Sequence, residues 1–305
     1  MRHAVPRKAV RKTTARRGEG APDVQAGAAP RTYRLTRVGV RGVKKPVTVH
    51  RPRQKPHGVV ATFDLFVDLP ARQRGTHMSR NLEALAGILD EEVVGRETKG
   101  LENLCRRLAE RLLEKHDYAS HAHVRAEADY FLTRKNPGGR PTVENYRLLA
   151  EAEAFRGRPS LRRVGVQVVG ITACPCAMET VRHRLGPKAR GVPVITHNQR
   201  NRVTIVLDLP GDGDVEAADL VEVAEAGLSS PTYELLKRGD EADLVLAAHA
   251  KPRFVEDVVR EVLHGLRGRY AALGDLEAFV SSEAEESIHK HNAYAERRTT
   301  LGAKE

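Results

Sequence analysis

The chain has 305 residues, which is enough for one large domain or two modest ones around a buried core. It contains no run of about 18 apolar residues, and no apolar stretch follows its basic N-terminus, so the sequence predicts neither a membrane span nor a secretory signal. Its three cysteines, two of them separated by a single proline, do not make a disulfide framework. We therefore expect a protein of the reducing cytoplasm.

The net charge of +11 is unevenly distributed. Residues 1–22 carry seven Lys or Arg against one Glu, among Ala, Pro and Gly, which predicts a basic disordered tail. A basic nucleic-acid-binding protein is the alternative from another functional class, and it would rest on this tail and the charge alone. Aromatic residues make up only 4% of the chain, which argues against a surface that stacks on bases. The remaining basic surplus suits a phosphorylated small molecule.

The first half of the chain predicts strands followed by helices. Arg34–Pro52 alternates apolar and polar residues and is typical of a strand pair, and Val59–Pro70 predicts a stronger strand. Ser79–Glu97 and Lys99–Asp117 carry apolar residues at helical spacing, and Gly100 predicts the break between them.

Two strands around a turn should follow. Ser120–Lys135 alternates, and the Asn-Pro-Gly-Gly segment after it is a turn. Propensity alone would make the Ala- and Glu-rich stretch Glu144–Arg158 a helix, but its alternation after the turn favours a return strand. Leu161–Cys176 predicts a further strand.

The second half repeats this order. Arg200–Pro210 echoes the earlier strand, helical patterns cover Glu216–Gly227 and Glu256–Leu273, and a strand is expected near Leu276–Ser281. The sequence therefore predicts two similar modules, 23–160 and 161–305, after the tail. Neither standard glycine-rich phosphate loop is present, so folds that depend on such loops lose support.

Two of the cysteines, Cys174 and Cys176, flank a proline. They are too close together for a zinc-knuckle pair, no second pair exists, and the spacing of a redox pair is absent. The segment taken alone fits a turn with two small thiols. A thiolate, an imidazole and a carboxylate together would instead suit Zn²⁺ or Fe²⁺ with an open position for water. The candidate donors are Cys174, His197, Glu241, Glu256, Asp257, Glu286, His289 and His291.

Several longer motifs carry a family resemblance. They are Asp23–Gln25, Gly75–Arg80, Cys174–Cys176, His197–Arg200, Ser229–Glu241, Phe254–Asp257 and Glu286–Ala295. In these motifs and their order, the chain resembles the GTP cyclohydrolases of the prokaryotic type IB family over about residues 23 to 295. The resemblance implies an α+β tunnel fold of two tandem antiparallel-sheet modules with helices packed on one face.

The resemblance also implies a metal site. Cys174, His197 and Glu241 match the family's metal ligands, with Fe²⁺ as the expected metal and Zn²⁺ or Mn²⁺ as alternatives. Cys176 would be a neighbouring thiol rather than a ligand.

The other site residues follow from the same match. Glu256 would accept hydrogen bonds from the guanine N1–H and amino group, since a carboxylate suits this bidentate geometry. Glu286 and His289 would move protons beside the reacting ring. The expected phosphate contacts are His77, Arg80 and Arg200.

The implied reaction hydrolyses GTP at C8 of guanine, releases formate and closes a dihydropterin ring. Twenty-two residues separate Cys174 from His197. This interval resembles that of the archaeal methanopterin-pathway branch of the family. That branch yields 7,8-dihydroneopterin 2′,3′-cyclic phosphate and pyrophosphate. The alternative product is the 7,8-dihydroneopterin triphosphate used in folate synthesis.

A nitrile reductase of the same fold would use a cysteine nucleophile and NADPH, but the segments around His197 and Glu241 match the metal-dependent family better. Tunnel-fold enzymes close their barrel between subunits and build sites at those interfaces. The resemblance therefore implies a homo-oligomer, with a tetramer as the expectation.

Overall fold

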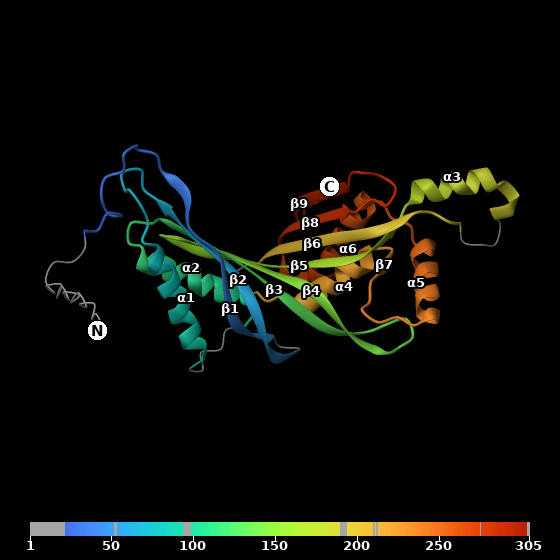
Figure 1. The fold of residues 1–305 in the computed structure, drawn as a ribbon, viewed down its shortest axis with the longest axis horizontal. Coiled ribbons are helices and arrows are strands. Elements are labelled where there is room, and N and C mark those ends of the chain that lie inside the picture. Colours follow the sequence, from blue (N-terminus) through green and yellow to red (C-terminus); the bar gives the residue numbers. More distant parts are fainter. Residues whose placement is uncertain are drawn as a thin grey trace, which may run out of the picture.

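The structure is a computed structural model that describes residues 22–303 apart from 52–53, 94–98, 190–193, 210, 212 and 275. The predicted basic tail lies, except for its last residue, outside the described residues. The described chain is an α+β protein built around one large antiparallel sheet (Figure 1), which confirms the α+β part of the predicted fold class. No helix in the described part of the chain is long and apolar enough to cross a membrane.

The strands follow one another across the sheet in the order β1-β2-β3-β4-β5-β6-β8-β9, and the short β7 pairs with β5. Their bounds are β1 Leu35–Arg51, β2 Gln54–Leu69, β3 His121–Lys135, β4 Pro141–Phe155, β5 Arg158–Ala173, β6 Asn198–Leu209, β7 Ser230–Pro231, β8 Glu277–Ala284 and β9 Ala293–Thr300. The α-helices are α1 Met78–Val93, α2 Leu101–Lys115, α3 Pro175–Leu185, α4 Ala217–Gly227, α5 Arg238–Ala250 and α6 Val255–Tyr270. Single 3-10 turns occupy 186–189 and 271–273.

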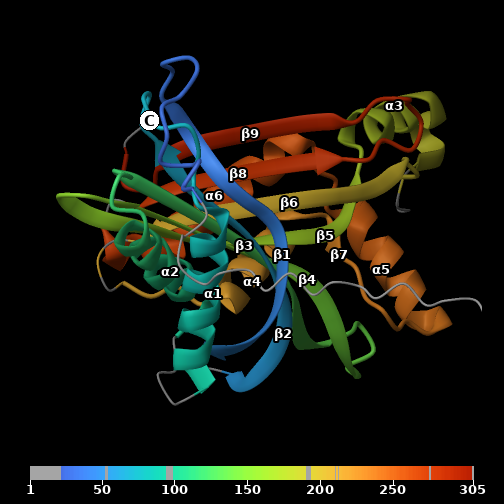
Figure 2. The same ribbon diagram turned by 60° about the vertical axis from the view of Figure 1, so that its left-hand side comes forward.

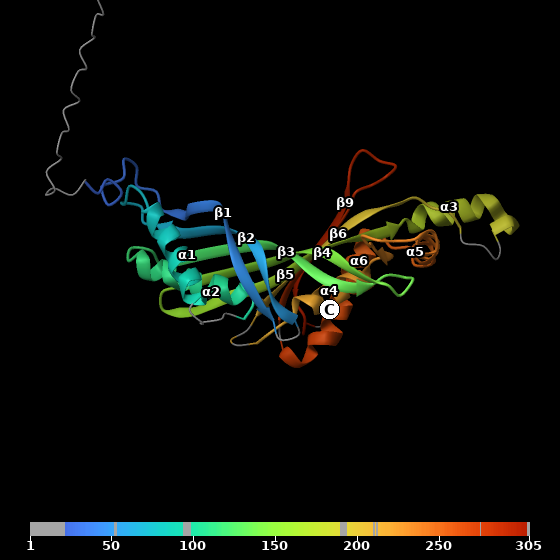
Figure 3. The same cartoon turned by 60° about the horizontal axis from the view of Figure 1, so that its bottom comes forward.

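Helices α1, α2, α4 and α6 cover one face of the sheet (Figure 3). α2 packs on β3, β4 and β5, while α4 and α6 pack on each other, α4 also on β5 and α6 on β8 and β9. α3 and α5 lie at the end of the sheet away from α1 and α2 (Figure 2). The apolar core therefore lies between the sheet and a single layer of helices.

Alternating residues produce the core-facing side of the sheet. In β4, burial alternates strictly from Thr142 to Ala154, so the alanines face α2 while the intervening glutamates face away. This confirms the predicted return strand. The helix propensity of alanine and glutamate is overridden because the strand buries its alanines between two neighbouring strands and a helix.

The prediction of a strand pair over Arg34–Pro52 is wrong. β1 is one long strand that pairs along its length with β2. Irregularities in the register, one of them beside Gly42 with a φ of 72°, let the strand bend without turning back.

The sequence patterns do not predict α3 and α5. α5 buries only Asp240, Leu244 and Ala248, so its sequence has no need of the apolar stripe that identifies a core helix. α3 buries only Met178. Both helices project from the sheet, so neither carries the apolar spacing by which core helices are recognised.

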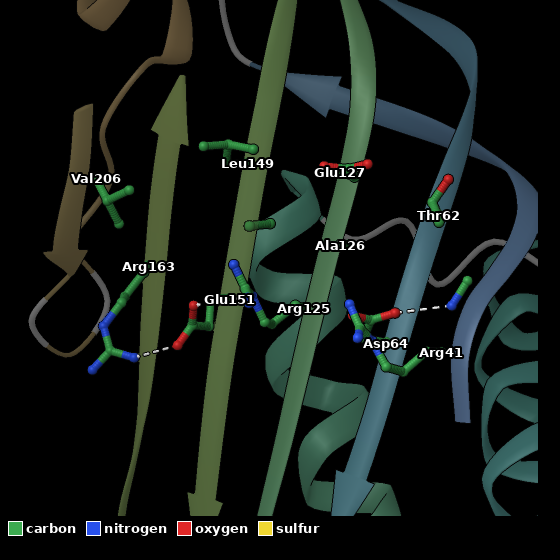
Figure 4. Close-up of a pocket in the computed structure, with 12 residues that line it drawn as sticks. Arg41, Thr62, Asp64, Arg125, Ala126, Glu127, Leu149, Glu151, Arg163 and Val206 are labelled. Atoms are coloured by element: carbon green, nitrogen blue, oxygen red, sulfur yellow. Dashed lines mark hydrogen bonds and ion pairs between the residues drawn. The ribbon is translucent and has the colours of Figure 1, made fainter. Parts of the chain in front are cut away.

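The face of the sheet that the helices leave open carries a row of alternating charges (Figure 4). Its members, one from each strand β1 to β6, are Arg41, Asp64, Arg125, Glu151, Arg163 and Asp208. Burial tends to raise the pKa of Glu151, but its hydrogen bond with His123 and the charges of Arg163 and Arg125 outweigh this effect and lower the pKa to about 2. Opposite charges on directly paired residues stabilise a sheet, so this row favours the observed register.

A buried ion pair joins β1 to α2. Arg51 Nη2 lies 2.8 Å from Glu102 Oε2, and each side chain is only 1% exposed. Arg51 Nη1 also donates to the carbonyl of Val215, in the segment before α4, at 3.2 Å. Burial raises the pKa of Glu102, and the charge of Arg51 opposes that rise. One guanidinium therefore connects elements from both halves of the chain.

Replacing Arg51 with Met should lower the free energy of unfolding by about 3–5 kcal/mol, because the Glu102 carboxylate would stay buried without its counter-charge. The double variant Arg51→Met/Glu102→Leu should regain most of this loss. Urea denaturation followed by circular dichroism measures both. Arg41→Met, which removes an exposed partner of an ion pair, serves as the control and should cost less than about 1 kcal/mol. A similarly small loss for Arg51→Met would contradict the role of the pair.

Candidate active site

At the end of β6 nearest α3, the core-facing row changes from apolar to polar. Val203 and Ile205 are fully buried, and the same row continues through Asn201 and Gln199 to His197, just before the strand. Residues two apart in a strand share a face. The alternation that builds the core thus also directs these polar side chains to the core side of the sheet.

The two strands beside β6 change in the same way. The buried row of β5 passes through Thr172 to Cys174, and that of β8 passes through Ala284 to Glu286. Thr172 lies directly opposite Gln199 in the antiparallel register. Polar ends of three neighbouring strands therefore meet at one place.

Cys174 lies between β5 and α3. It is the N-cap of α3, and its Sγ accepts a hydrogen bond from the N–H of Ala177 at 3.5 Å, with Pro175 in the first turn. The Cys174 N–H donates to the carbonyl of His197 at 3.0 Å. The thiol thus lies at the positive end of a helix, where negative charge is favoured. Cys176, one residue further into α3, is exposed.

Three polar side chains converge on Nδ1 of His197. Gln199 Oε1 lies 3.0 Å from it, Ser287 Oγ 3.5 Å and Glu286 Oε2 3.7 Å. Gln199 Nε2 also donates to Glu286 Oε1 at 3.3 Å. Gln199 therefore bridges the imidazole and the carboxylate.

A cavity of about 220 Å³ lies between these strand ends and the start of α6. Cys174, Gln199, Glu256 and Glu286 are among the residues that line it. Glu256 is in the first turn of α6, whose N-terminus is capped by Asp257 through the N–H of Phe254 at 3.1 Å. Three residues predicted for separate roles, Cys174, Glu256 and Glu286, thus face one pocket.

The structure sets Glu241 apart from these residues within one chain. It is exposed in the first turn of α5. The opposite end of α5 approaches the site, where His249 Nε2 lies 3.4 Å from the carbonyl of Thr196. His249 follows Glu241 by eight positions, which is about 12 Å of helix.

Two other predicted residues lie at the margin. His289 is exposed in the connection between β8 and β9, and its ring stacks on that of His291 with centroids 5.1 Å apart. Arg200 is exposed and alternates with Gln199, so its side chain lies on the opposite face of β6 from the pocket.

The predicted phosphate contacts His77 and Arg80 lie at the other end of the molecule, beside the start of α1 (Figure 1). His77 Nε2 lies 2.9 and 3.0 Å from the two carboxylate oxygens of Asp23. Arg80 donates to the carbonyl of Lys115 at 3.1 Å. The structure therefore does not bring them to the pocket of the same chain.

The donor set can be compared with what a metal needs. In the parts of the chain that the structure describes, no three His, Cys, Asp or Glu side chains are grouped closely enough to hold a metal ion. Cys174 and His197, which are joined through their backbones, offer a thiolate and an imidazole, and both suit Zn²⁺ and Fe²⁺. Two donors of the right kind are therefore adjacent, and a third has to come from elsewhere.

Comparison with known proteins decides the family. The family model for type I GTP cyclohydrolase folE2 matches residues 21–295. The chain belongs to this family. Family membership confirms the prediction that the chain is a GTP cyclohydrolase.

Similar proteins include two archaeal enzymes named GTP cyclohydrolase MptA. The protein of Methanothermobacter thermautotrophicus is 40% identical over 299 residues, which cover 92% of this chain and 94% of the relative. The protein of Methanosphaera stadtmanae is 41% identical over 300 residues, which cover 92% of this chain and 96% of the relative. Among solved structures, uricase from Arthrobacter globiformis has a TM-score of 0.55 at 9% identity and covers 89% of this chain and 96% of its own, which indicates a shared fold only.

Gln199, Arg253 and Tyr294 also line the pocket, although the sequence motifs predict no role for them. The signal for Gln199 was present, because it lies two residues from His197 at the start of a predicted strand. Arg253 and Tyr294 could not be found in this way, because the packing of α6 and β9 brings them to the cavity.

A buried polar network lies next to the predicted phosphate contacts. His116 Nε2 lies 2.7 Å from Asn81 Oδ1, and its Nδ1 lies 2.8 Å from the Tyr118 hydroxyl, which reaches Thr76 Oγ1 at 2.5 Å. Burial, assisted by the charge of Arg80, lowers the pKa of His116 from 6.5 to about 4. The network thus holds a neutral imidazole between α1 and α2.

His116 should make stability depend on pH. The unfolded chain binds a proton near pH 6.5 and the folded chain resists it, so the contribution is complete above that pH and is lost as pH falls toward 4. Between pH 7 and pH 4.5, the wild type should lose about 2–3 kcal/mol more unfolding free energy than His116→Gln. Urea denaturation of both proteins at the two pH values measures this difference. Equal losses in the two proteins would show that His116 does not carry the effect.

Proposed function

We propose that this GTP cyclohydrolase converts GTP to formate and a 7,8-dihydroneopterin phosphate in pterin synthesis. The observation that carries the proposal is that Cys174, Glu256 and Glu286 line one cavity at the ends of β5, β6 and β8. One substrate could therefore meet all three groups. They are a thiol to bind a metal, a carboxylate to bind the guanine and a carboxylate to transfer protons.

The proposed metal is Fe²⁺, with Zn²⁺ or Mn²⁺ as alternatives. Cys174 and His197 would hold it, and Glu241 is the proposed third ligand. When bound, such a divalent ion supplies Lewis-acid activation of water at neutral pH. Because Glu241 is in the first turn of α5 and the opposite end of that helix approaches the site, the Glu241 of a second copy is the favoured ligand.

Glu256 is the proposed anchor for guanine. Its carboxylate would accept hydrogen bonds from N1–H and the 2-amino group, an arrangement that only a guanine-type edge satisfies. Anchoring the ring in this way would hold it in the cavity that Cys174 and Glu286 also line. Much of the rate acceleration would then come from positioning.

Glu286 and His289 would exchange protons with the ring during hydration at C8 and ring opening. Glu286 is half-buried and already hydrogen-bonded by Gln199, so its position is defined. His289 follows Glu286 by three residues in the exposed connection between β8 and β9.

The proposed phosphate contacts require a second copy of the chain. His77 and Arg80 lie at the opposite end of the sheet from Cys174, and a neighbouring molecule could supply them (Figure 1). Both edges of the described sheet, β1 and β9, are open to further pairing. These features support a homo-oligomer, with a tetramer as the proposed state.

The element order supports two tandem tunnel-fold modules. β1-β2-α1-α2-β3-β4 is followed by a second series of two strands, helices and two strands that ends with β8-β9. The proposed boundary at residue 160 lies within β5, and the sheet continues across it because β4 pairs with β5.

The proposed product is the 2′,3′-cyclic phosphate, released with pyrophosphate. The MptA relatives support this branch, and so does the long interval between Cys174 and His197. In this chain most of that interval forms α3 and a 3-10 turn rather than an open loop. The alternative product remains the triphosphate.

Anaerobic protein loaded with Fe²⁺ should release formate from GTP, and mass spectrometry of the pterin should give the cyclic phosphate. Glu256→Gln, which turns one acceptor oxygen into a donor, should lower kcat/KM by at least about a hundredfold. Asp257→Asn is the neighbouring control and should retain most activity. No formate with Fe²⁺, Mn²⁺ or Zn²⁺ would refute the proposed reaction.

Co-expression of two inactive variants tests whether each active site is built from two copies of the chain. His77→Ala and Cys174→Ala damage opposite ends of the chain, so co-expression should restore activity to about a quarter of wild type if each site combines both ends from two copies. Formate release from the mixed oligomer measures this. If the mixture is as inactive as its components, sites are not shared in this way.

A further inference from the structure

Gln199 occupies the point where the imidazole and the carboxylate of the pocket meet. Its side chain is only 9% exposed, and both ends of its amide are used. Oε1 lies 3.0 Å from His197 Nδ1, and Nε2 donates to Glu286 Oε1 at 3.3 Å. A buried amide with both ends engaged can define the geometry of both partners.

The chemistry of the three groups determines the direction of each hydrogen bond. The NH₂ end of Gln199 faces Glu286 and donates to its Oε1. The carbonyl end then faces His197, and a carbonyl also only accepts. Nδ1 of His197 must therefore carry the proton, which leaves the lone pair of the neutral ring on Nε2.

We propose that Gln199 is a positioning residue for the metal and proton-transfer groups. It selects the His197 tautomer whose Nε2 is able to bind a metal, and it holds the Glu286 carboxylate toward the cavity. This inference rests on the proposed function, in which His197 is a metal ligand. Among the described residues, no hydrogen bond reaches His197 Nε2, so this nitrogen is the one available to an ion.

Neighbouring groups do not replace this function. Ser287 Oγ lies 3.5 Å from His197 Nδ1, at the limit of a hydrogen bond, and Ser287 is exposed. Glu286 Oε2 is 3.7 Å from the same nitrogen, which is too far for a good hydrogen bond. Without Gln199, the ring could turn or change tautomer.

The test measures metal affinity directly, with Co²⁺ as the probe. Co²⁺ bound by a thiolate absorbs in the near ultraviolet, so titration of the metal-free protein reports binding at Cys174 without any turnover. Gln199→Leu, which keeps the shape of the side chain and removes both hydrogen bonds, should weaken Co²⁺ binding about ten- to hundredfold.

The matched control is Gln167→Leu. Gln167 lies on the adjacent strand β5, is half-buried, and donates to Thr204 Oγ1 at 3.2 Å on the opposite face of the sheet. It should bind Co²⁺ as the wild type does. Thermal unfolding of both leucine variants checks that the fold is kept.

Gln199→Glu separates the two tasks of the residue. Its carboxylate can still accept the Nδ1–H of His197 but repels Glu286 instead of donating to it. Co²⁺ affinity should stay within about threefold of wild type, since the tautomer is kept. Formate release from GTP at saturating metal should fall at least about tenfold.

His197→Ala distinguishes the inference from the proposed function. If His197→Ala abolishes the Co²⁺ spectrum while Gln199→Leu binds as tightly as Gln167→Leu, the positioning role is overturned and the metal site stands. If His197→Ala binds Co²⁺ like the wild type, His197 is not a ligand, and the proposed site and this inference both fail. Weak binding by Gln199→Leu together with Gln199→Glu near wild type supports the inference.

Discussion

The register of β5, β6 and β8 decides which side chains face the pocket, because successive residues of a strand point to opposite faces of a sheet. Thr172 lies opposite Gln199, and Asn201 opposite Ala284. A slip of one residue in β6 would turn His197 and Gln199 to the open face and bring Arg200 inward. The chemistry of the site therefore depends on the same pairing that buries Val203 and Ile205 in the core.

That register is supported on both faces of the sheet. On the covered face the buried apolar rows pack against α2, α4 and α6. On the open face, opposite charges stand directly across neighbouring strands from Asp64 on β2 to Asp208 on β6, and Arg41 on β1 donates to Asp64. Figure 4 shows this row from Arg41 to Arg163. Each face disfavours a slip of the register for a different reason. A slip would expose apolar residues of the covered face, and it would separate the charge pairs of the open face.

The predicted site residues fall into two separate groups within one chain. Cys174, His197, Glu256 and Glu286 gather at one end of the sheet, whereas His77 and Arg80 stay at the other (Figure 1). A long antiparallel sheet keeps its two ends apart, since the strands are stiff and the core is continuous. Under the proposed function, association of copies would bring both ends to one substrate.

The sequence by itself determined the order of the main strands and helices, the return strand after the Asn-Pro-Gly-Gly turn, and the family. Local alternation and long motifs carry this information within short stretches of chain. Only the tertiary structure decided that β1 is one strand, that Cys174 is the N-cap of α3, and that Gln199 joins His197 to Glu286. It also set Glu241 apart at the far end of α5. The contact between Gln199 and Glu286 joins segments more than 80 residues apart, and local periodicity does not encode such contacts.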